Sequence, residues 1–582
     1  MPDIEWLLPH PDPESVRSLA ACLGVQSLTA SVLINRGLSD PESARRFLSP
    51  SLDHLHDPLA LTGMAEAVSR IRSAIQAHEK ILIYGDYDVD GTVSVVILKK
   101  AIEIAGGAAD FHVPHRLKEG YGMRSEVIER AAAMGVTLII SVDTGIRALE
   151  VVHDARERGI DVIITDHHLP EAQLPPALAV LNPNRRDSVY PDKNLCGAGV
   201  AFKLVQALLA TLDWPEQKLA RMLKSFLKLV ALATVADVVP LTGENRIIVK
   251  HGLEGLNRVS NPGLQALLEV SGLDKGTAPS ARQVAFQIAP RINAAGRMDD
   301  AHDVIRLFLS DDLPRARAIA AQLHSLNKER QDTEADIVRL VLDECSRVPV
   351  TEDQAALVFA GPCWHRGVVG IVASRLVERF YRPVFVLSEE DGVAQGSGRS
   401  IPPFHLLDAL ESMPDLFTRF GGHRQAAGLS LPAELVPEFR RRLNAFAASR
   451  LTAADFRPQL DIDALVDLKE LTTGPAVAEL LSLAPFGFGN PPPVLALLGA
   501  QVASEPVWMK EKHLRVHLRH SGRSLFPTGW NFSGRVPAFS AGALTDAAFS
   551  VEEDTYAASR GEDRWSAVLR DLRPAAARAA SP

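Results

Sequence analysis

Length, composition and charge narrow the classes of protein to which this chain can belong. A composition of 46% hydrophobic and 23% charged residues is typical of a globular protein with apolar cores. The 582 residues are too many for one domain, so we expect three or four domains. The 62 Lys and Arg against 71 Asp and Glu give a net charge of −9, which is not the bulk charge of a nucleic-acid binder. A nuclease can still gather acids at its metals and bases along its groove, so local patterns have to decide.

Cysteine usage and the N-terminus indicate the compartment. The four cysteines lie far apart without a CxxC pair, which argues against a zinc ribbon or a disulfide framework and fits a reducing cytoplasm. The first residues carry acids and prolines where a signal peptide needs a basic start and an apolar run. No stretch approaches the roughly 20 apolar residues of a membrane span. We expect a cytoplasmic protein that does not associate with membranes.

The first two segments of the chain differ sharply in pattern. Residues 1–75 alternate short amphipathic pieces with Pro-containing turns, which predicts a helical lead-in packed on the domain that follows. From Lys80 the apolar runs ILIYG, ADFHVP, VTLIISV and DVIIT alternate with amphipathic helical segments. Apolar runs with little alternation are typical of strands buried on both faces, and short loops between strand and helix favour right-handed βαβ units. Residues 76–311 are therefore predicted to form an α/β domain with a parallel sheet.

The rest of the chain begins with a long helix. Residues 312–346 carry dense mixed charge and no Pro or Gly after their start, which predicts one helix joining two domains. Strand and helix signals resume over 347–452, where we expect a smaller α/β domain. PFGFGNPPPV begins a turn-rich, all-β module, which we place at 453–575.

Acids and imidazoles follow three of the predicted strands directly. Three acids lie in DYDVDG after ILIYG, one lies in SVDTG after VTLII, and TDHH follows DVII. These residues are Asp86, Asp88, Asp90, Asp143, Asp166, His167 and His168. Ligands gather beyond the carboxyl ends of parallel strands, so we expect one common crevice. Asp237 is a fourth candidate, because an unpaired acid in the apolar stretch LATVADVVPL would be costly.

This cluster predicts a binuclear metal site. Carboxylates that face one another repel and take up protons unless divalent cations hold them. Two metals about 3.5–4 Å apart can activate a water and stabilise the leaving oxygen of a phosphodiester. Oxygen-rich ligation with about one imidazole suits Mn²⁺ or Mg²⁺ better than zinc or copper. Each residue alone also has an ordinary alternative: a helix N-cap, a polar loop histidine or part of a phosphoacceptor pocket.

DYDVDG, VDTG, TDHH and TVADVVPL resemble, in the same order, the four motifs of the DHH phosphoesterase superfamily. The resemblance implies that one metal is held by Asp86, Asp88 and Asp143. It implies that the other is held by Asp90, Asp143, His167 and Asp237. Some members of the superfamily begin the first motif with a histidine, where this chain has Tyr84 and the additional Asp86.

The same resemblance implies two catalytic roles in TDHH. His168 would face the scissile phosphate, and Asp166 would orient the neighbouring imidazole. With the bridging Asp143, these two residues form the implied catalytic set.

Other segments resemble the RecJ family within that superfamily. They are RFLSPSLDHLHDP, VPHRLKEGYG, LCGAGVAFK and RINAAGRM, then GSGRSI and FGGHRQAAGLSL of a DHHA1-type domain, and PFGFGNPPPV of an OB-type domain. The resemblance implies hydrolysis of single-stranded DNA from its 5′ end to 5′-mononucleotides, in repair and recombination. It also implies a DHH domain over 76–311, a linker helix, a DHHA1 domain over 347–452 and an OB-type domain over 453–575. Single-strand-binding protein and a RecQ-type helicase are partners implied by the family alone.

Several of these segments are suited to binding phosphate. GSGRS offers backbone amides, Ser397 and the Arg399 guanidinium, a combination suited to a terminal phosphate. In FGGHRQAAG, Gly422 and His423 lie at a glycine-rich turn that a backbone can approach closely. The resemblance adds three arginines to this pocket: Arg116, Arg291 and Arg297. Ordinary tight turns and solvated arginines are the alternative interpretation.

The sharpest run of positive charge is KEKHLRVHLRHSGR in the last module. On one strand, Arg515, His517 and Arg519 share a face, while the apolar residues between them face the core. Nearby aromatic residues suit a single strand held by charge and stacking: Trp508, Phe526, Trp530 and Phe532. The alternative is a solvated strand with these aromatics in the core.

Two other functions remain open. A DHH phosphodiesterase of short oligonucleotides or cyclic dinucleotides usually ends after the second domain, so the basic third module argues against it. A non-catalytic DNA-binding scaffold on the same fold loses metal ligands, whereas this chain has the full set.

Overall fold

The computed structural model describes residues 4–116, 118–274, 276–472, 474–533, 539–554 and 565–575. The chain divides into two compact units. The first, here called the parallel-sheet unit, comprises residues 50–335 together with 485–490. The second, the composite unit, comprises the described residues of 1–49, 336–484 and 491–582. The expected lead-in over 1–75 is therefore divided between the two units.

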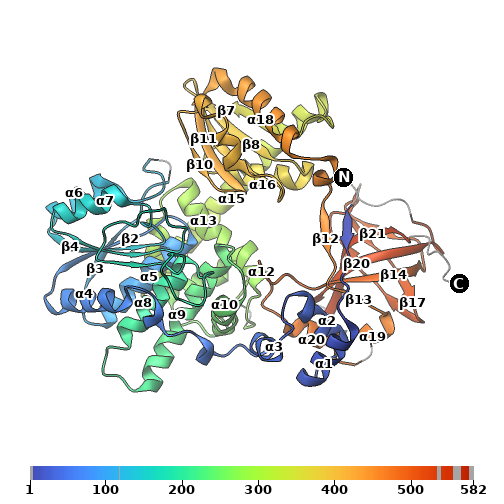
Figure 1. Cartoon of the computed structure of the whole chain (residues 1–582), viewed down its shortest axis with the longest axis horizontal. Helices are drawn as coiled ribbons and strands as arrows, with labels where there is room; N and C mark the ends of the chain where they lie inside the picture. The colour runs from blue at the N-terminus through green and yellow to red at the C-terminus, as the bar shows by residue number, and fades with distance from the viewer. Residues whose placement is uncertain are drawn as a thin grey trace. The chain divides into compact units, whose positions relative to one another are not determined.

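The parallel-sheet unit is built around five parallel strands in the order β3-β2-β4-β5-β6 (Figure 1). They are β2 (Lys80–Tyr84), β3 (Ala109–His112), β4 (Val136–Val142), β5 (Asp161–Thr165) and β6 (Ala179–Leu181). The four predicted strands are β2 to β5. Alternate strand residues face two separate apolar cores, as expected for a sheet buried on both faces.

Helices cover both faces of this sheet. The helices α4 (Met64–Gln76), α5 (Val89–Ile104) and α8 (Gly197–Leu209) pack on one face, and α6 (Ser125–Ala133) and α7 (Leu149–Glu157) pack on the other. The rest of the unit is helical: α9 (Glu216–Ala236), α10 (Gly243–Gly255), α11 (Pro262–Val270), α12 (Ala281–Gln283), a π-helical turn (Val284–Ile288), α13 (Ala289–Met298) and α14 (His302–Leu309). The predicted long helix is α15 (Leu313–Arg347).

The composite unit contains the predicted smaller α/β domain. Its mixed sheet has the order β10-β11-β9-β8-β7, and only β7 and β8 pair in parallel. The strands are β7 (Leu357–Pro362), β8 (Val384–Glu390), β9 (Val393–Arg399), β10 (Arg419–Gly422) and β11 (Ala426–Pro432). The accompanying helices are α16 (Val369–Phe380), α17 (Leu406–Glu411) and α18 (Val436–Arg450).

The last module is the all-β domain that the sequence predicts. Its sheet has the order β15-β16-β19-β21-β20-β14-β17-β18, with β13 beside β14. The strands are β13 (Ala464–Leu465), β14 (Val494–Val502), β15 (Val507–Met509), β16 (His513–Arg515), β17 (Leu518–His520), β18 (Arg523–Leu525), β19 (Thr528–Gly529), β20 (Leu544–Glu553) and β21 (Trp565–Pro574). The short helices α19 (Leu468–Thr472) and α20 (Ala476–Ser482) precede β14.

One prediction for this module is wrong in part. LRVHLRH does not form one strand: Arg515 ends β16, which pairs with β15 and β19, whereas Arg519 lies in β17, which pairs with β14 and β18. The break lies at Val516 and His517, whose backbone groups bond to Pro527 and Ala503 outside these ladders. The alternation of burial survives, because Leu514, Val516 and Leu518 are buried.

The N-terminal segment packs on this last module. Strand β1 (Glu5–Leu7) pairs in parallel with β12 (Gln459–Asp461). The helices α1 (Pro13–Leu23), α2 (Ser27–Asn35) and α3 (Pro41–Leu48) follow, and the Thr29 hydroxyl donates to the Glu479 carboxylate of α20 at 2.7 Å. Among the described residues no single helix has the length and apolar composition to cross a membrane; α1 and α2 meet them only as a pair bent by 112°.

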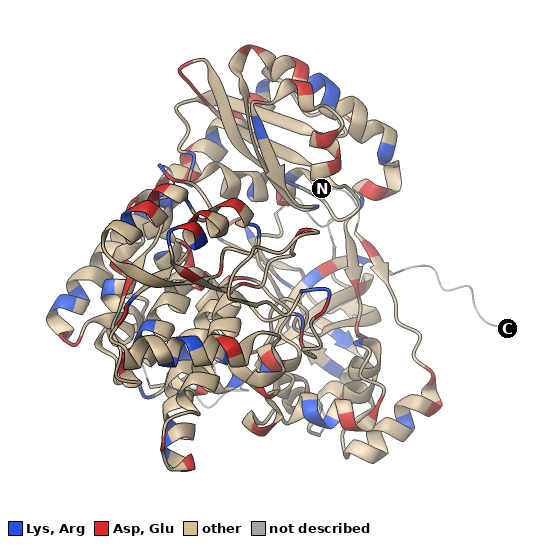
Figure 2. Ribbon diagram, turned by 60° about the vertical axis from the view of Figure 1, so that its left-hand side comes forward, with Lys and Arg blue, Asp and Glu red and all other residues tan. Residues whose placement is uncertain are grey.

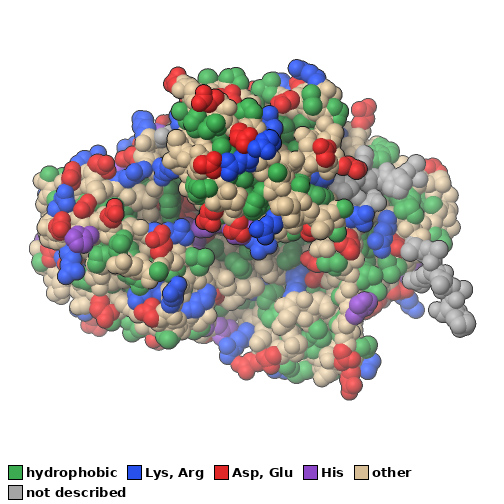
Figure 3. All heavy atoms as spheres, turned by 45° about the horizontal axis from the view of Figure 1, so that its top comes forward, with side chains coloured by type: hydrophobic (Ala, Val, Ile, Leu, Met, Phe, Trp, Pro, Cys, Tyr) green, Lys and Arg blue, Asp and Glu red, His purple; other side chains and the backbone are tan. Residues whose placement is uncertain are grey.

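Charges of both signs are mixed over the surface. Ribbon positions of Lys and Arg are interspersed with those of Asp and Glu (Figure 2). The face shown in Figure 3 likewise mixes acidic, basic and apolar side chains. This mixing explains why a net charge of −9 says little about any one site.

Candidate metal centre and substrate-binding residues

The turn after β2 brings three acids together by a tight backbone path. Asp88 caps α5, because its Oδ1 accepts a hydrogen bond from the Gly91 amide at 3.0 Å. A Cβ on Gly91 would lie 2.5 Å from the backbone oxygen of Asp86, so DYDVDG requires glycine at its end. Asp86 and Asp90 are buried on either side of this cap.

The N-terminus of α8 holds Asp90. Its two carboxylate oxygens accept hydrogen bonds from the amides of Gly197 at 2.6 Å and Ala198 at 2.8 Å. Free amides and the positive end of the helix dipole favour a carboxylate here. The segment LCGAGVAFK therefore orients an acid of the first motif from more than a hundred residues away.

Asp143 occupies a strained position at the end of β4. Its φ is +58°, in the left-handed region that disfavours a residue with a Cβ. Its amide donates to the carbonyl of Thr165 at 2.9 Å. A Cβ on Gly197 would lie 2.6 Å from both Cβ and Oδ1 of Asp143, so α8 approaches this acid as closely as a glycine permits.

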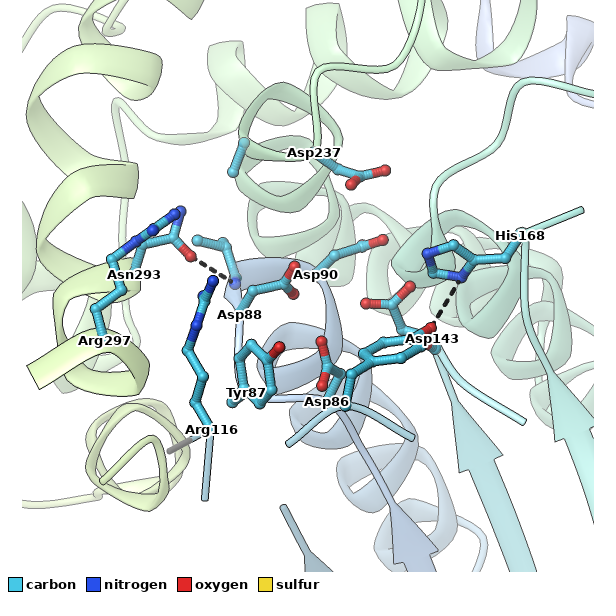
Figure 4. A pocket seen from close by; sticks show the side chains of 13 residues that line it. Asp86, Tyr87, Asp88, Asp90, Arg116, Asp143, His168, Asp237, Asn293 and Arg297 are labelled. Carbon is cyan, nitrogen blue, oxygen red and sulfur yellow. Dashed lines mark hydrogen bonds between the residues drawn. The ribbon is translucent and has the colours of Figure 1, made fainter. Parts of the chain in front are cut away.

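The acids lie close together in one pocket (Figure 4), and with the two histidines they form overlapping groups of possible metal ligands, two of which match the expected sets. Ligand atoms of Asp86, Asp88 and Asp143 lie within 4.8 Å of one another, and so do those of Asp90, His167 and Asp237. Nε2 of His167 lies 3.2 Å from Asp143 Oδ1, 3.7 Å from Asp237 Oδ2 and 3.9 Å from Asp90 Oδ2. Asp143 thus lies close to both groups.

The electrostatics of these groups fit divalent cations. Within the two groups, four buried atoms have no hydrogen-bond partner among the described residues: Asp86 Oδ1, Asp143 Oδ1, His167 Nε2 and Asp237 Oδ2. Burial and the neighbouring acids raise the pKa of Asp86 and Asp143 well above the usual range, and burial and the charge of Asp90 raise the pKa of Asp237 to about 9. Hard cations satisfy unpaired carboxylate oxygens and remove this repulsion.

Asp166 is a different kind of acid, because hydrogen bonds satisfy it fully. Its Oδ1 accepts from His168 Nδ1 at 2.7 Å and from the amides of His167 and His168, and its Oδ2 accepts from the Ile146 amide at 2.9 Å. Burial acts to raise the pKa of Asp166, but these bonds outweigh it and the pKa is lowered. Burial likewise opposes a charge on His168, yet its bond to Asp166 raises the pKa of His168. Asp166 therefore orients the imidazole and favours its protonated form.

The pocket over the acids has a second, cationic wall. Arg116 and Arg297 line it, and the Arg116 guanidinium carbon lies 5.0 Å from the centre of the Tyr87 ring. Sequence reasoning missed three other lining residues: Tyr87, Tyr121 and Asn293. The Tyr121 hydroxyl lies 3.3 Å from His168 Nδ1 and donates to the carbonyl of Asp143 at 3.4 Å.

Arg291, the third arginine that the resemblance implies, does not line this pocket. Its guanidinium donates to His324 Nδ1 at 3.2 Å and to the carbonyl of Gln287. Asn293 and Arg297 are four residues apart on α13 and share a face, whereas Arg291 lies on another face of the same helix. The spacing of these residues within RINAAGRM is the sequence signal that the two arginines lie on different faces of the helix.

The phosphate-binding candidates of the composite unit lie in its mixed sheet. Ser397 and Arg399 are two residues apart on β9, and a Cβ on Gly370 in the first turn of α16 would lie 3.5 Å from Ser397 Oγ and 3.2 Å from Arg399 Nη2. Gly422 has φ +148°, and the His423 amide donates to the carbonyl of Ala426 at 2.8 Å, closing the turn between β10 and β11.

The basic and aromatic residues of the all-β module divide by burial. Arg515 and Arg519 are exposed, and so are Trp508, Phe526 and Trp530. The His517 ring stacks on Phe526 with centroids 4.4 Å apart. Phe532 is only 2% exposed and packs on Gly529, so it belongs to the core and not to a binding face.

Three family models match the chain. They are the DHH family N-terminal domain over residues 80–234, the DHHA1 domain over 353–449 and the RecJ OB domain over 462–564. The parallel sheet and its acid cluster thus define a DHH phosphoesterase. Within this class, the match to the RecJ OB domain and the likeness to RecJ relatives over most of the chain show that it belongs to the RecJ family.

Relatives named single-stranded-DNA-specific exonuclease RecJ cover most of the chain. That of Bacillus subtilis is 41% identical over 91% of this chain, which spans 66% of that relative. That of Dickeya dadantii is 40% identical over 90% of this chain and 89% of the relative. The structure of RecJ with Mn²⁺ from Thermus thermophilus matches 99% of this chain and 80% of that one, with a TM-score of 0.82 and 32% identity.

Gly197→Ala tests the close approach of α8 to Asp143. Because the added Cβ would lie 2.6 Å from the carboxylate, we expect about a tenfold loss of phosphodiesterase activity and weaker Mn²⁺ uptake in titration calorimetry, without unfolding. The control is Gly255→Ala in α10, where the new Cβ meets only the flexible Lys228 side chain. Equal behaviour of the two variants would contradict the role given to α8.

Proposed function

We propose that this chain hydrolyses single-stranded DNA from its 5′ end and releases 5′-mononucleotides, using two divalent ions, Mn²⁺ or Mg²⁺. The observation that carries the proposal is the pair of ligand groups around Asp143, facing a wall with Arg116 and Arg297. A phosphodiester needs both features: cation ligands at the reacting phosphorus and arginines for the charge of the backbone. The membership of the RecJ family supports DNA repair and recombination as the setting.

The ligands divide into two sets that share one acid. Asp86, Asp88 and Asp143 would hold one ion. Asp90, Asp143, His167 and Asp237 would hold the other. When bound, the two ions supply an activated water and stabilise the charge on the leaving oxygen.

The protein's own groups position the substrate. His168, which Asp166 orients and whose protonated form Asp166 stabilises, would donate a hydrogen bond to the scissile phosphate. Arg116 and Arg297 would pair with neighbouring phosphates. Ser397, Arg399, Gly422 and His423 would bind the terminal phosphate, a role supported by the closeness of the Ser397 and Arg399 side chains to the first turn of α16 and by the tight turn at Gly422.

Digestion of a long single strand labelled at either end tests the function. Release of mononucleotides from the 5′ label with Mn²⁺ or Mg²⁺, but not with EDTA, and sparing of a blunt duplex are the expected results. Binding without cleavage in any metal would indicate the non-catalytic scaffold. Cleavage confined to the shortest oligonucleotides would indicate the short-substrate phosphodiesterase.

The exposed arginines of the all-β module are proposed to hold the strand. Arg515→Ala combined with Arg519→Ala is expected to weaken binding of a long strand and to reduce the slope of log K against log salt by about 1 to 1.5, since each phosphate contact on a single strand contributes roughly 0.7. Fluorescence anisotropy at several salt concentrations measures both quantities.

The matched control for this prediction is Arg339→Ala with Arg441→Ala. Both arginines are exposed and form ion pairs with acids three residues away, so this variant removes the same charge at sites that are not proposed to bind DNA. An unchanged salt slope in the first double variant would mean that Arg515 and Arg519 do not contact DNA. Single-strand-binding protein and a RecQ-type helicase are proposed as partners on the family alone, and a cytoplasmic location is proposed from the scattered cysteines.

A further inference from the structure

A six-residue turn of the last module belongs to the parallel-sheet unit. Residues 485–490 lie between α20 and β14, yet they cluster with residues 50–335. Gly487 and Asn490 exchange two backbone hydrogen bonds of 2.9 and 3.1 Å, and the Asn490 side chain donates to the carbonyl of Pro485 at 2.8 Å. Asn490 is buried, so the turn is closed by a side chain that solvent does not reach.

The turn is fastened to the segment that follows Asp237. The Leu241 amide donates to the carbonyl of Phe488 at 2.7 Å. A Cβ on Gly487 would lie 2.6 Å from the Leu241 side chain, and one on Gly489 would lie 2.8 Å from Pro240. Glycines on both sides of Phe488 therefore allow the backbone of the turn to contact Pro240 and Leu241 closely. Gly489 also has φ +72°, a conformation that favours glycine.

This constrained backbone holds two apolar side chains in solvent. Phe488 is 61% exposed, although the turn around it packs closely. Val238, also 61% exposed, has φ +60°, a strained conformation for a β-branched residue. Strain of this kind is retained where the surroundings fix it and is common at functional sites. Val238 directly follows Asp237, which lines the pocket with Ala236.

We propose that Phe488 is a stacking surface for one base of the single strand whose backbone enters the metal pocket. The inference rests on the proposed function, in which the acids and arginines act on the phosphates and not on the bases. An aromatic face suits this substrate, since every base has a π-face and stacking requires no particular sequence. The rigid turn lowers the entropy that ordering a free Phe side chain would cost.

Three substitutions at Phe488 separate stacking from general apolar contact. Because one stacked base is worth roughly a five- to 150-fold change in affinity, Phe488→Ala and Phe488→Leu should weaken binding of a 20-nucleotide strand by that factor, and Phe488→Trp should restore it. Binding is measured by anisotropy in EDTA, and Mn²⁺ uptake by calorimetry reports whether Asp237 has moved. Leu59→Ala, at a 61% exposed residue of the same unit, is the control and should bind normally.

A scan with single abasic nucleotides tests the same contact from the DNA side. In the unaltered protein, removal of the base at one position should lower the affinity for the strand by the same factor. In Phe488→Ala, removal of that base should leave the affinity unchanged. The proposal is overturned if Phe488→Ala binds the strand with normal affinity, if Phe488→Leu binds as tightly as Phe488→Trp, or if no abasic position lowers the affinity. A protein that neither binds nor cuts single-stranded DNA would instead refute the proposed function, so the two failures are distinguishable.

Discussion

Asp143→Ala is expected to reduce the release of nucleotides from single-stranded DNA more than about a hundredfold, because in the proposed assignment both ions share this ligand and no other side chain can replace it. Asp143 Oδ1 lies 3.2 Å from His167 Nε2, and the carboxylate also belongs to the group formed with Asp86 and Asp88. The loss should persist at saturating Mn²⁺ and be accompanied by loss of bound ion in calorimetry.

The control is Asp213→Ala, an exposed acid of the same unit. It should retain full activity, and both variants should keep the circular dichroism of the unaltered protein. Retention of more than about a hundredth of the activity by Asp143→Ala would contradict the assignment of a shared ligand.

Mn²⁺ is expected to raise the melting temperature, and the increase should be larger at pH 8 than at pH 6. Burial and mutual repulsion raise the pKa of Asp86, Asp90, Asp143 and Asp237 in the folded state, the last to about 9. The unfolded chain loses these protons near pH 4, so the metal-free protein loses stability as pH rises from about 4 toward 9. Ions that replace the protons abolish this loss.

Scanning calorimetry with EDTA and with excess Mn²⁺ measures both quantities. An ion present at a thousand times its Kd contributes about 4 kcal/mol, roughly 10 °C for a domain of this size. The Asp143→Ala variant should show a smaller increase with Mn²⁺ at each pH. A shift that is the same at pH 6 and pH 8 would mean that the carboxyls already carry their charges without metal.

The βαβ half of the molecule could be predicted from the sequence because its signals are local. Apolar runs mark β2 to β5, and the acids follow those strands directly, so the geometry of a parallel sheet brings Asp86, Asp143 and His167 together. Asp237 was found for a different reason, namely the cost of an acid among apolar residues.

Long-range packing decided what the sequence did not predict. Arg297 and Arg291 lie on different faces of α13, and only Arg297 lines the pocket. The strand is interrupted at Val516 and His517 because their backbone groups bond to Pro527 and Ala503. Neither the pairing of β1 with β12 nor the docking of the turn around Phe488 has a local signal.

The turn at 485–490 also affects how the chain is made. The parallel-sheet unit is discontinuous, and its last piece follows residue 335 by roughly 150 residues. At a synthesis rate of about 5–20 residues per second, that piece emerges from the ribosome some 10–30 s after the rest of the unit. During this interval Pro240 and Leu241 lack their partner, so the growing chain exposes an apolar edge beside Asp237 until residues 485–490 have been translated.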